Sequence, residues 1–316
     1  MRIVFCGTPK FAVPPLQRLL EEPGITVETV ITQPDRPRGR GKKLSASAVK
    51  EAGLAAGLHV YQPEKIKSES ATDFFRRIAV DAVIVIAYGH MIPASLLTVP
   101  RLGWLNLHAS LLPKYRGAAP INWAIINGES STGLTMMQIA KGLDTGAILQ
   151  QLAMPIAPAE TAPELSTRMS EAGGSFVIET LRKLDRGEIT PVPQDERLAT
   201  YAPILEKENG RIDWNQPAQS IYNRIRGLAP WPGAFTTFRG QLCHIWGGPA
   251  ADAVAGKSEV PGTIIGTKRI YVVCGDGTSL EVESAQVEGR ARVAARDFAN
   301  GMRLKNNERF GEQSPK

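Results

Sequence analysis

Two polar residues, Asn106 and His108, close a short apolar run in the segment Trp104-Leu-Asn-Leu-His108. Side chains two residues apart on a strand share a face, so Asn106 and His108 are expected to point the same way. An amide beside an imidazole suits a reaction in which an oxyanion forms while a proton moves. The alternative is that these polar groups only satisfy backbone groups at the end of a strand.

Asp144 is the third candidate, because two glycines flank it in Gly142-Leu-Asp-Thr-Gly146. Such a turn can direct a carboxylate inward, and a carboxylate that orients an imidazole is a common arrangement for proton transfer. A solvated aspartate in a hairpin turn is the simpler interpretation when Asp144 is taken alone. The spacing leaves open whether Asp144 and His108 meet.

Two neighbouring segments have the composition of loops. Residues 110–122 contain Pro113, Gly117 and Pro120, which favour a shaped connection able to wall a pocket for a flat heterocycle, or an ordinary link from strand to helix. Residues 34–43 hold five cations, one anion and no large apolar side chain, which gives a local charge of +4. This segment is either a solvated loop or an arm that follows a nucleic-acid backbone.

The elements that must position these residues alternate in the first half of the chain. Strands are predicted at 2–7, 27–32, 58–61, 82–87 and 104–108, with helices at 11–22, 45–57 and 68–79. This order predicts an α/β fold with a doubly wound sheet, which binds ligands at the carboxyl ends of its strands. Strands at 132–139 and 147–156 and a long helix at 160–186 are predicted to follow.

The second half of the chain has a different pattern. Residues 187–207 are rich in proline, glutamine and charge and show no periodicity, which favours a linker. Beyond it, a helix is predicted at 217–227, followed by short strands at 234–238, 242–246, 262–266, 269–274 and 279–283. Short strands separated by glycines favour a small barrel. We therefore predict domains at 1–189 and 208–316, joined by a linker at 190–207.

Composition excludes several classes of protein. The 316 residues suit two globular domains, and the net charge of +6 permits a polyanionic partner. Three scattered cysteines and four histidines lack the spacing of a disulfide framework or a metal site, so no metal is expected. No apolar run approaches the ~20 residues of a membrane span, and the first strand starts at residue 2, before any signal peptide could fit. We expect a cytoplasmic monomer with no membrane contact.

The motif Asn106-x-His108-x-Ser110-Leu-Leu-Pro113, with Asp144 downstream, resembles the signature of the 10-formyltetrahydrofolate-dependent formyltransferases. Other segments resemble the branch of that family that formylates methionyl initiator tRNA; they lie at 7–9, 32–37, 39–43, 115–121, 211–214 and 230–233. The resemblance implies a Rossmann-like catalytic domain and an OB-like tRNA-binding domain. It also implies transfer of a formyl group from 10-formyltetrahydrofolate to the α-amino group of methionyl initiator tRNA, in support of translation initiation.

The resemblance assigns roles to particular residues. His108 would relay a proton with help from Asp144, while Asn106 would hold the oxyanion. The folate pocket would be lined by Ser110, Leu111, Leu112 and Pro113 and by backbone at Ile86, Ala87 and Tyr88. The acceptor stem of the tRNA would meet Arg36, Arg38, Arg40, Lys42 and Lys43, with Arg40 the foremost contact.

Other functions fit less of the sequence. A formyltransferase that acts on a nucleotide-sugar amine shares the motif around Asn106 and His108, but the basic segment and the C-terminal motifs argue against it. Glycinamide ribonucleotide transformylase is a single shorter domain. A non-enzymatic nucleic-acid-binding protein would not need the Asn106, His108 and Asp144 set. The first turn, Gly7-Thr-Pro9, lacks the glycine fingerprint of a nicotinamide dehydrogenase.

Overall fold

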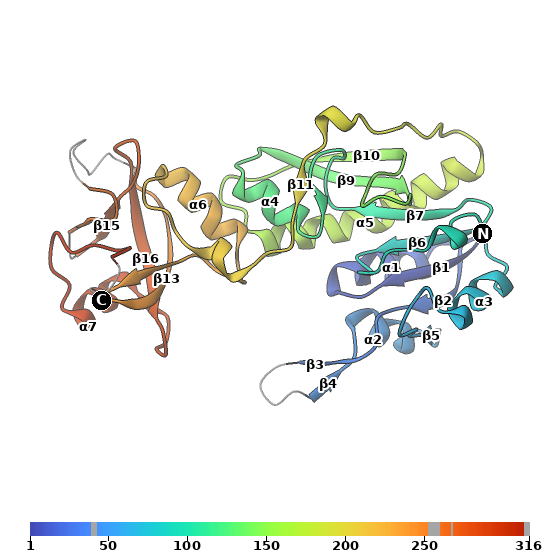
Figure 1. Ribbon diagram of the computed structural model, residues 1–316, viewed down its shortest axis with the longest axis horizontal. Coiled ribbons are helices and arrows are strands. Elements are labelled where there is room, and N and C mark those ends of the chain that lie inside the picture. Colours follow the sequence, from blue (N-terminus) through green and yellow to red (C-terminus); the bar gives the residue numbers. More distant parts are fainter. Residues whose placement is uncertain (39–42, 252–259, 267, 313–316) are drawn as a thin grey trace. The chain divides into compact units, whose positions relative to one another are not determined.

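The computed structural model describes residues 1–38, 43–251, 260–266 and 268–312. The chain divides into two compact units (Figure 1). The first comprises Met1–Pro120, Ser131–Pro155 and Glu164–Pro203, and the second comprises Ile121–Ser130, Ile156–Pro163 and Ile204–Lys316. The last division, between residues 203 and 204, falls within the predicted linker at 190–207. In the described residues, no helix combines the length and the apolar character needed to cross a membrane.

A seven-stranded sheet organises the first unit, in the order β10-β9-β7-β6-β1-β2-β5. The strands are β1 (Arg2–Gly7), β2 (Thr26–Ile31), β5 (His59–Tyr61), β6 (Ala82–Ile86), β7 (Trp104–His108), β9 (Ser131–Gln138) and β10 (Ile148–Pro155). The five strands from β7 to β5 are parallel, whereas β9 runs antiparallel to both of its neighbours, β7 and β10. The predicted α/β fold with a mostly parallel sheet is confirmed.

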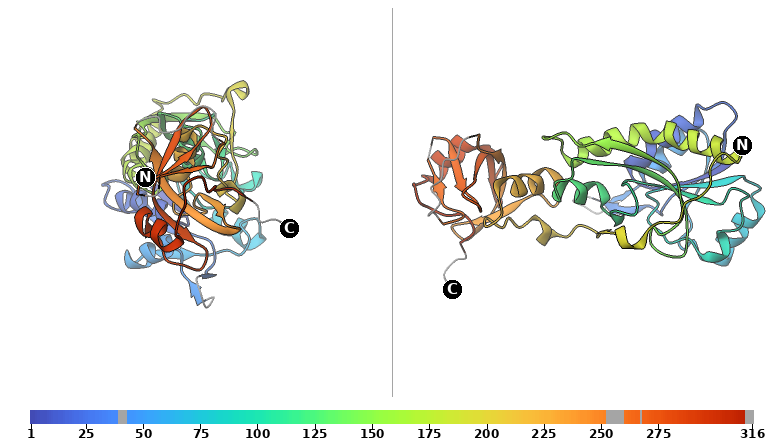
Figure 2. Two further views of the ribbon diagram at one scale, coloured as in Figure 1. Left: turned by 90° about the vertical axis from the view of Figure 1, so that its left-hand side faces the viewer. Right: turned by 90° about the horizontal axis from the view of Figure 1, so that it is seen from above.

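Helices cover both faces of this sheet (Figures 1 and 2). They are α1 (Val13–Leu20), α2 (Ala48–Ala55), α3 (Glu69–Arg77) and α5 (Ala162–Asp185), and short 3-10 turns lie at Lys10–Ala12, Ala94–Leu96 and Glu196–Leu198. On the face of α3, the Phe75 ring lies 4.7 Å from that of Trp104. On the opposite face, Gly173 of α5 lies against Leu107. Because strand residues alternate, Asn106 and His108 share the face of Trp104.

Local capping explains where two of these helices begin. Ser47 accepts a hydrogen bond from the Lys50 amide at 3.0 Å, and Ser68 accepts one from the Ala71 amide at 3.2 Å. Each serine therefore satisfies a backbone donor that has no partner within the first helical turn. Ser47 is therefore the N-cap of α2, which begins three residues after the start predicted for this helix.

The basic segment at 34–43 is flanked by paired backbone rather than by a solvated loop. Its flanks form an antiparallel hairpin from β3 (Arg36–Arg38) and β4 (Lys43–Ser45). Asp35 holds the base of this hairpin, because it accepts hydrogen bonds from Lys50 Nζ at 2.6 Å and from Gln62 Nε2 at 2.9 Å. The expectation of a loop was wrong at these flanks, where backbone pairing supplies the order that an apolar core would otherwise provide.

The second unit contains a six-stranded antiparallel sheet in the order β12-β13-β16-β15-β14, with β17 paired to β16. Its strands are β12 (Phe235–Phe238), β13 (Gln241–Pro249), β14 (Ile264–Ile265), β15 (Ile270–Val273), β16 (Ser279–Val287) and β17 (Val293–Ala294). Its core includes the stacked rings of Trp214 and Phe310. An antiparallel β domain after residue 204 agrees with the predicted pattern of short strands.

Three helices belong wholly or largely to this unit: α4 (Pro120–Ile126), α6 (Ala218–Gly227) and α7 (Ala295–Met302); a 3-10 turn lies at Lys207–Gly210. Gly227 allows α4 and α6 to approach, because a Cβ there would lie 2.7 Å from a side-chain carbon of Ile126. The helix predicted at 217–227 is α6, the connection at 110–122 leads into α4, for which no bounds were predicted, and α7 was not predicted. Both α4 and α7 are short, so neither extends the 3.6-residue period far enough to be recognised.

Candidate active site

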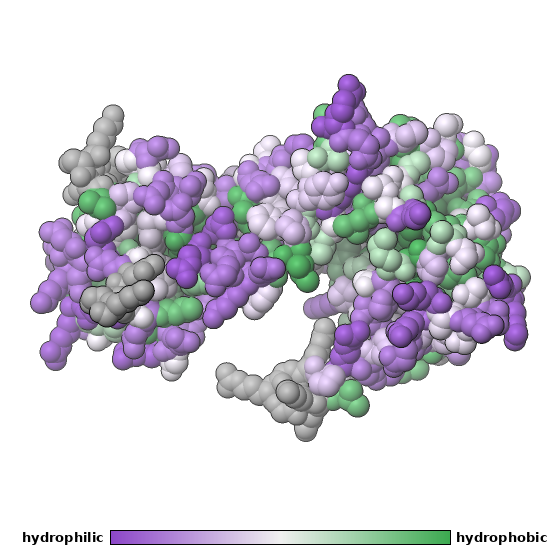
Figure 3. Space-filling view, in the orientation of Figure 1, coloured by the Kyte–Doolittle hydropathy of each residue, from purple (hydrophilic) through white to green (hydrophobic). Residues whose placement is uncertain are grey.

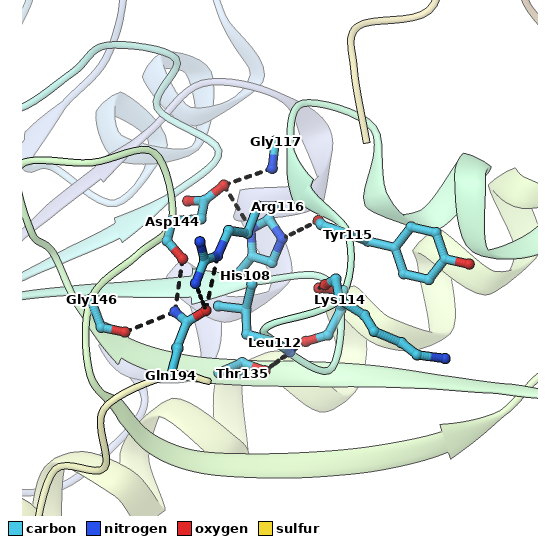
Figure 4. A network of polar contacts seen from close by, with 11 residues as sticks. His108, Leu112, Lys114, Tyr115, Arg116, Gly117, Thr135, Asp144, Gly146 and Gln194 are labelled. Carbon is cyan, nitrogen blue, oxygen red and sulfur yellow. Dashed lines mark hydrogen bonds and ion pairs between the residues drawn. The ribbon is translucent and has the colours of Figure 1, made fainter. Parts of the chain in front are cut away.

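His108 ends β7 and is held from both sides of its ring. The side chain is 6% exposed, and Nε2 lies 2.9 Å from the Tyr115 carbonyl oxygen. A carbonyl only accepts, so Nε2 carries the hydrogen and donates it. The other ring nitrogen, Nδ1, lies 3.6 Å from Asp144 Oδ2 (Figure 4). His108 thus directs Nδ1 toward a carboxylate that can stabilise an imidazolium.

Asp144 reaches this position from a tight turn between β9 and β10. Its backbone adopts a φ of +51°, a left-handed conformation that aspartate tolerates better than most residues. The turn closes at Gly146, where a Cβ would lie 1.6 Å from the Gln138 carbonyl oxygen. The Gly117 amide donates to Asp144 Oδ2 at 2.9 Å and so fixes the carboxylate. The structure brings Asp144 and His108 together, which the sequence spacing had left open.

Asn106 lies two residues before His108 on the same face of β7 and is partly exposed. Its neighbour across the parallel pairing is Val85, near the carboxyl end of β6. Within the described ranges, the Asn106 side chain makes no hydrogen bond to another residue. Its amide is therefore available to a bound molecule.

The segment predicted to line a folate pocket, 110–113, is fixed by its own hydrogen bonds. Ser110 is buried, and its hydroxyl donates to a backbone carbonyl of the same loop. The Thr135 hydroxyl donates to the Ser110 carbonyl at 2.6 Å and accepts from the Leu112 amide at 3.1 Å. Leu111 and Pro113 remain partly exposed, whereas Leu112 is buried. Solvent therefore reaches this segment at Leu111 and Pro113 rather than at Ser110 or Leu112.

The second predicted folate segment, 86–88, follows the neighbouring strand β6. Ile86 and Tyr88 are buried, and burial raises the pKa of Tyr88. Ala87 between them is exposed, with a φ of +48°. The Tyr88 carbonyl accepts hydrogen bonds from the Thr8 hydroxyl and from Gln33 Nε2, at 3.1 and 2.9 Å. These contacts fix a turn that exposes backbone at the end of β6.

The basic residues predicted to meet tRNA belong to the hairpin of β3 and β4. Arg36 is exposed on β3. Arg38 and Lys43 end and begin the paired strands, opposite each other in register. Arg40 and Lys42 lie outside the described residues.

Two side chains of this network were not among the predicted site residues: Arg116 and Gln194 (Figure 4). Arg116 is 1% exposed and donates from Nε and Nη2 to Gln194 Oε1, at 3.0 and 2.8 Å. It also forms an ion pair with Glu196 at 2.8 Å, which raises the pKa of Arg116 and lowers that of Glu196. Gln194 and Glu196 lie in the predicted linker, where the sequence offers no periodic signal. Only the motif at 115–121 pointed to Arg116.

No cluster of three or more histidine, cysteine, aspartate or glutamate side chains suited to a metal ion occurs among the described residues. The side chains near the end of β7 are an imidazole, a carboxylate and a carboxamide, and the Gly117 backbone amide lies beside the carboxylate. This set can accept a proton and stabilise an oxyanion.

Comparison with known proteins identifies the family. The Formyl transferase model matches residues 1–181, and the model of the formyl transferase C-terminal domain matches residues 204–303. Methionyl-tRNA formyltransferase of Solibacter usitatus is 50% identical over 312 residues, which cover 99% of both chains. The chain belongs to the methionyl-tRNA formyltransferase family. The family's enzymes from Koribacter versatilis and Enterococcus faecalis are 50% and 43% identical, over 99% and 95% of this chain.

Solved structures with less sequence similarity share the fold. The sugar 3N-formyltransferase WlaRD, solved with dTDP and 5-N-formyl-THF, has a TM-score of 0.68 at 19% identity, over 92% of this chain and 99% of its own. HypX from Aquifex aeolicus, in complex with tetrahydrofolic acid, has a TM-score of 0.60 at 17% identity, over 98% of this chain and 48% of its own. The sugar enzyme is thus far less similar in sequence than the family members above.

Proposed function

We propose that this protein transfers the formyl group of 10-formyltetrahydrofolate to the α-amino group of methionyl initiator tRNA and so supports translation initiation. The observation that carries the proposal is the grouping of Asn106, His108 and Asp144 at the end of β7, in a chain half identical to methionyl-tRNA formyltransferases along its whole length. The structural neighbours described as acting on sugar amines, by contrast, are only 16–19% identical to this chain.

The reaction forms one carbon–nitrogen bond and breaks another. The α-amino nitrogen attacks the formyl carbon, the bond from that carbon to N10 of the folate breaks, and one proton passes from the amine to N10. Nδ1 of His108 accepts that proton and returns it, because Nε2 is engaged by the Tyr115 carbonyl. Asp144 faces the imidazolium while the proton is held. Asn106 donates from its amide to the oxyanion of the tetrahedral intermediate.

For the folate, we assign the exposed backbone at Ala87 and the partly exposed Leu111 and Pro113 as pocket walls. Structural relatives were solved with 5-N-formyl-THF, with tetrahydrofolic acid and with folinic acid, which supports this choice of co-substrate. A flat pterin suits backbone donors and acceptors beside apolar side chains. Ser110 contributes by fixing its loop, since its buried hydroxyl is engaged by backbone.

For the tRNA, we assign the hairpin of β3 and β4, with its arginines and lysines, to the acceptor stem. The second unit is assigned an OB-like barrel that contacts phosphates. Its five-strand antiparallel path and the charge of +4 over residues 207–316 support this assignment. The first unit is the catalytic domain in this proposal, and the enzyme acts as a monomer in the cytoplasm.

The test is a formylation assay with the purified protein, 10-formyltetrahydrofolate and methionyl initiator tRNA, with a nucleotide-sugar amine as the competing acceptor. We expect formyl-methionyl-tRNA to form and the sugar amine to remain unmodified. His108→Ala should lower kcat by roughly 10²–10⁴, the contribution of a positioned acid–base group. Formylation of the sugar amine alone would refute the proposal, and wild-type turnover by His108→Ala would remove His108 from the mechanism.

A further inference from the structure

Residues 192–202, here called the strap, leave α5 and cross the first unit beside the active site (Figure 1). The strap starts as a bridge to β10, where Val192 and Ile148 exchange two backbone hydrogen bonds of 2.8 and 2.9 Å. It ends as β11 (Tyr201–Ala202), which pairs in parallel with β8 (Arg116–Gly117). Its first contact thus lies two residues after the turn of Asp144, and its last lies on the loop that follows His108.

The two ends of the strap hold the two pieces of backbone that fix Asp144. At one end, the Ala202 carbonyl accepts hydrogen bonds from the amides of Ala118 and Ala119, at 2.8 and 3.2 Å. These residues adjoin Gly117, whose amide donates to Asp144 Oδ2. The strap therefore supports the donor that orients the carboxylate as well as the strand that follows its turn.

Gln194 connects these two pieces with one side chain. Its Nε2 donates to the carbonyl oxygens of Asp144 and Gly146, each at 2.8 Å, so both ends of the turn that carries the carboxylate are engaged. Its Oε1 accepts from Arg116, the residue before Gly117. The amide group of Gln194 thus donates two hydrogen bonds from its nitrogen and accepts two at its oxygen. No other natural side chain of this length offers two donors and an acceptor on one planar group.

Arg116 depends on the strap for the acceptors of its side-chain hydrogen bonds. Its guanidinium is almost completely buried, and within the described residues its recorded side-chain partners are Gln194, Glu196 and Tyr201, all of the strap. A buried donor that loses its acceptor is costly, so the loop at 116–117 cannot keep its place if the strap leaves. The outer surface of the strap, by contrast, is open to solvent. Glu196, Arg197 and Leu198 are exposed there, and Figure 3 shows a mainly hydrophilic surface over this turn.

We infer that Gln194 is a positioning residue for formyl transfer: it locks the Asp144 turn to the Arg116–Gly117 backbone and thereby holds the carboxylate at His108. The inference rests on the proposed function, and it gives the strap a role in catalysis beyond connecting the two units. Gln194 touches neither reacting group, so its effect must pass through Asp144.

The test uses Gln194→Met, which keeps the length but removes both donors and the acceptor, and Gln194→Glu, which keeps the acceptor for Arg116. The control is Leu198→Ala, an exposed residue of the same strap. We expect kcat to fall about 10- to 100-fold in both Gln194 variants, the cost of misplacing a catalytic group by a fraction of a bond length. The KM values for tRNA and folate should stay within about twofold, and the control should match the wild type.

A double-mutant cycle tells positioning from general destabilisation. In an Asp144→Asn background, Gln194→Met should lower kcat by less than about twofold, because the carboxylate that Gln194 positions has already been lost. Hydrogen exchange offers a readout independent of turnover: the Gly117 amide should exchange faster in Gln194→Met and unchanged in Leu198→Ala. The inference would be overturned if the losses of kcat from the two substitutions multiplied in the double variant. It would also be overturned if Gln194→Met changed neither kcat nor the exchange rate of the Gly117 amide. A wild-type protein that formylates no tRNA would instead refute the proposed function, while the exchange result would still test the strap.

Discussion

Gly117→Ala should damage both the stability of the first unit and the active site. Gly117 adopts a φ of +122°, which side-chain-bearing residues rarely adopt, and a Cβ there would lie 2.6 Å from the Ala202 carbonyl oxygen. That oxygen is the acceptor for the amides of Ala118 and Ala119, so the methyl group must push the strap away from the loop. The Gly117 amide, which donates to Asp144, moves with the loop.

The size of the effect follows from these contacts. Backbone strain of this kind costs about 1–3 kcal/mol. The two hydrogen bonds to Ala202 add about 0.5–1.5 kcal/mol each if they are lost. We therefore expect the first unit to lose roughly 2–6 kcal/mol of stability. A hydrogen bond to a charged group is worth about 1.5–3 kcal/mol. Its loss from Asp144 corresponds to a decrease in kcat of about 10- to 150-fold.

The assay measures melting temperature by calorimetry and kcat for formylation at saturating folate and tRNA. The control is Gly57→Ala, because Gly57 also has a positive φ of +71° but has open space where a Cβ would lie. That variant should lose some stability and keep its kcat. If Gly117→Ala keeps the wild-type kcat at a temperature where it is folded, the argument that this amide holds Asp144 is refuted.

Two further variants probe the ion pairs at the edges of the site. Asp35→Ala removes the acceptor for Lys50 at the base of the hairpin. The KM for tRNA should therefore rise up to about fivefold, the size expected for a solvent-accessible ion pair, and the KM for folate should stay unchanged. Equal changes in both KM values would assign Asp35 a general structural role. Glu196→Gln breaks the ion pair with Arg116. That pair lowers the pKa of Glu196, so its stabilising effect is complete above the ordinary carboxyl pKa of about 4.3 and is lost as the pH falls through the lower folded value. The wild type should therefore have a higher melting temperature than Glu196→Gln at pH 7, and this difference in melting temperature should disappear on acidification. A difference that grows in acid would contradict the assignment.

The sequence specified the parallel sheet well because its strands are short, apolar and fully buried. The strand at 104–108 was predicted with the bounds of β7, and Asn106 and His108 share a face as their spacing requires. These signals are local: a run of buried residues or a period of two is visible without knowledge of the partner strands.

The parts that were missed depend on partners distant in the sequence. β8 pairs with β11 some 85 residues later, and both are only two residues long. The strap is held mainly by backbone groups and by polar side chains such as Gln194, which leave no hydrophobic period in the sequence. A segment of this composition resembles a linker even where several of its residues form hydrogen bonds with the sheet and its loops.

The strap has a consequence for the order in which the protein is made. Asp144 leaves the ribosome before Gln194, which follows it by 50 residues. At roughly 5–20 residues per second, the nascent chain needs about 2.5–10 s to extend from one to the other. During that interval the residues of β7 and of the Asp144 turn have been made, but the strap that bonds to the turn through Gln194 has not. The active site is therefore completed late in synthesis, after the sheet on which it stands has been available to fold.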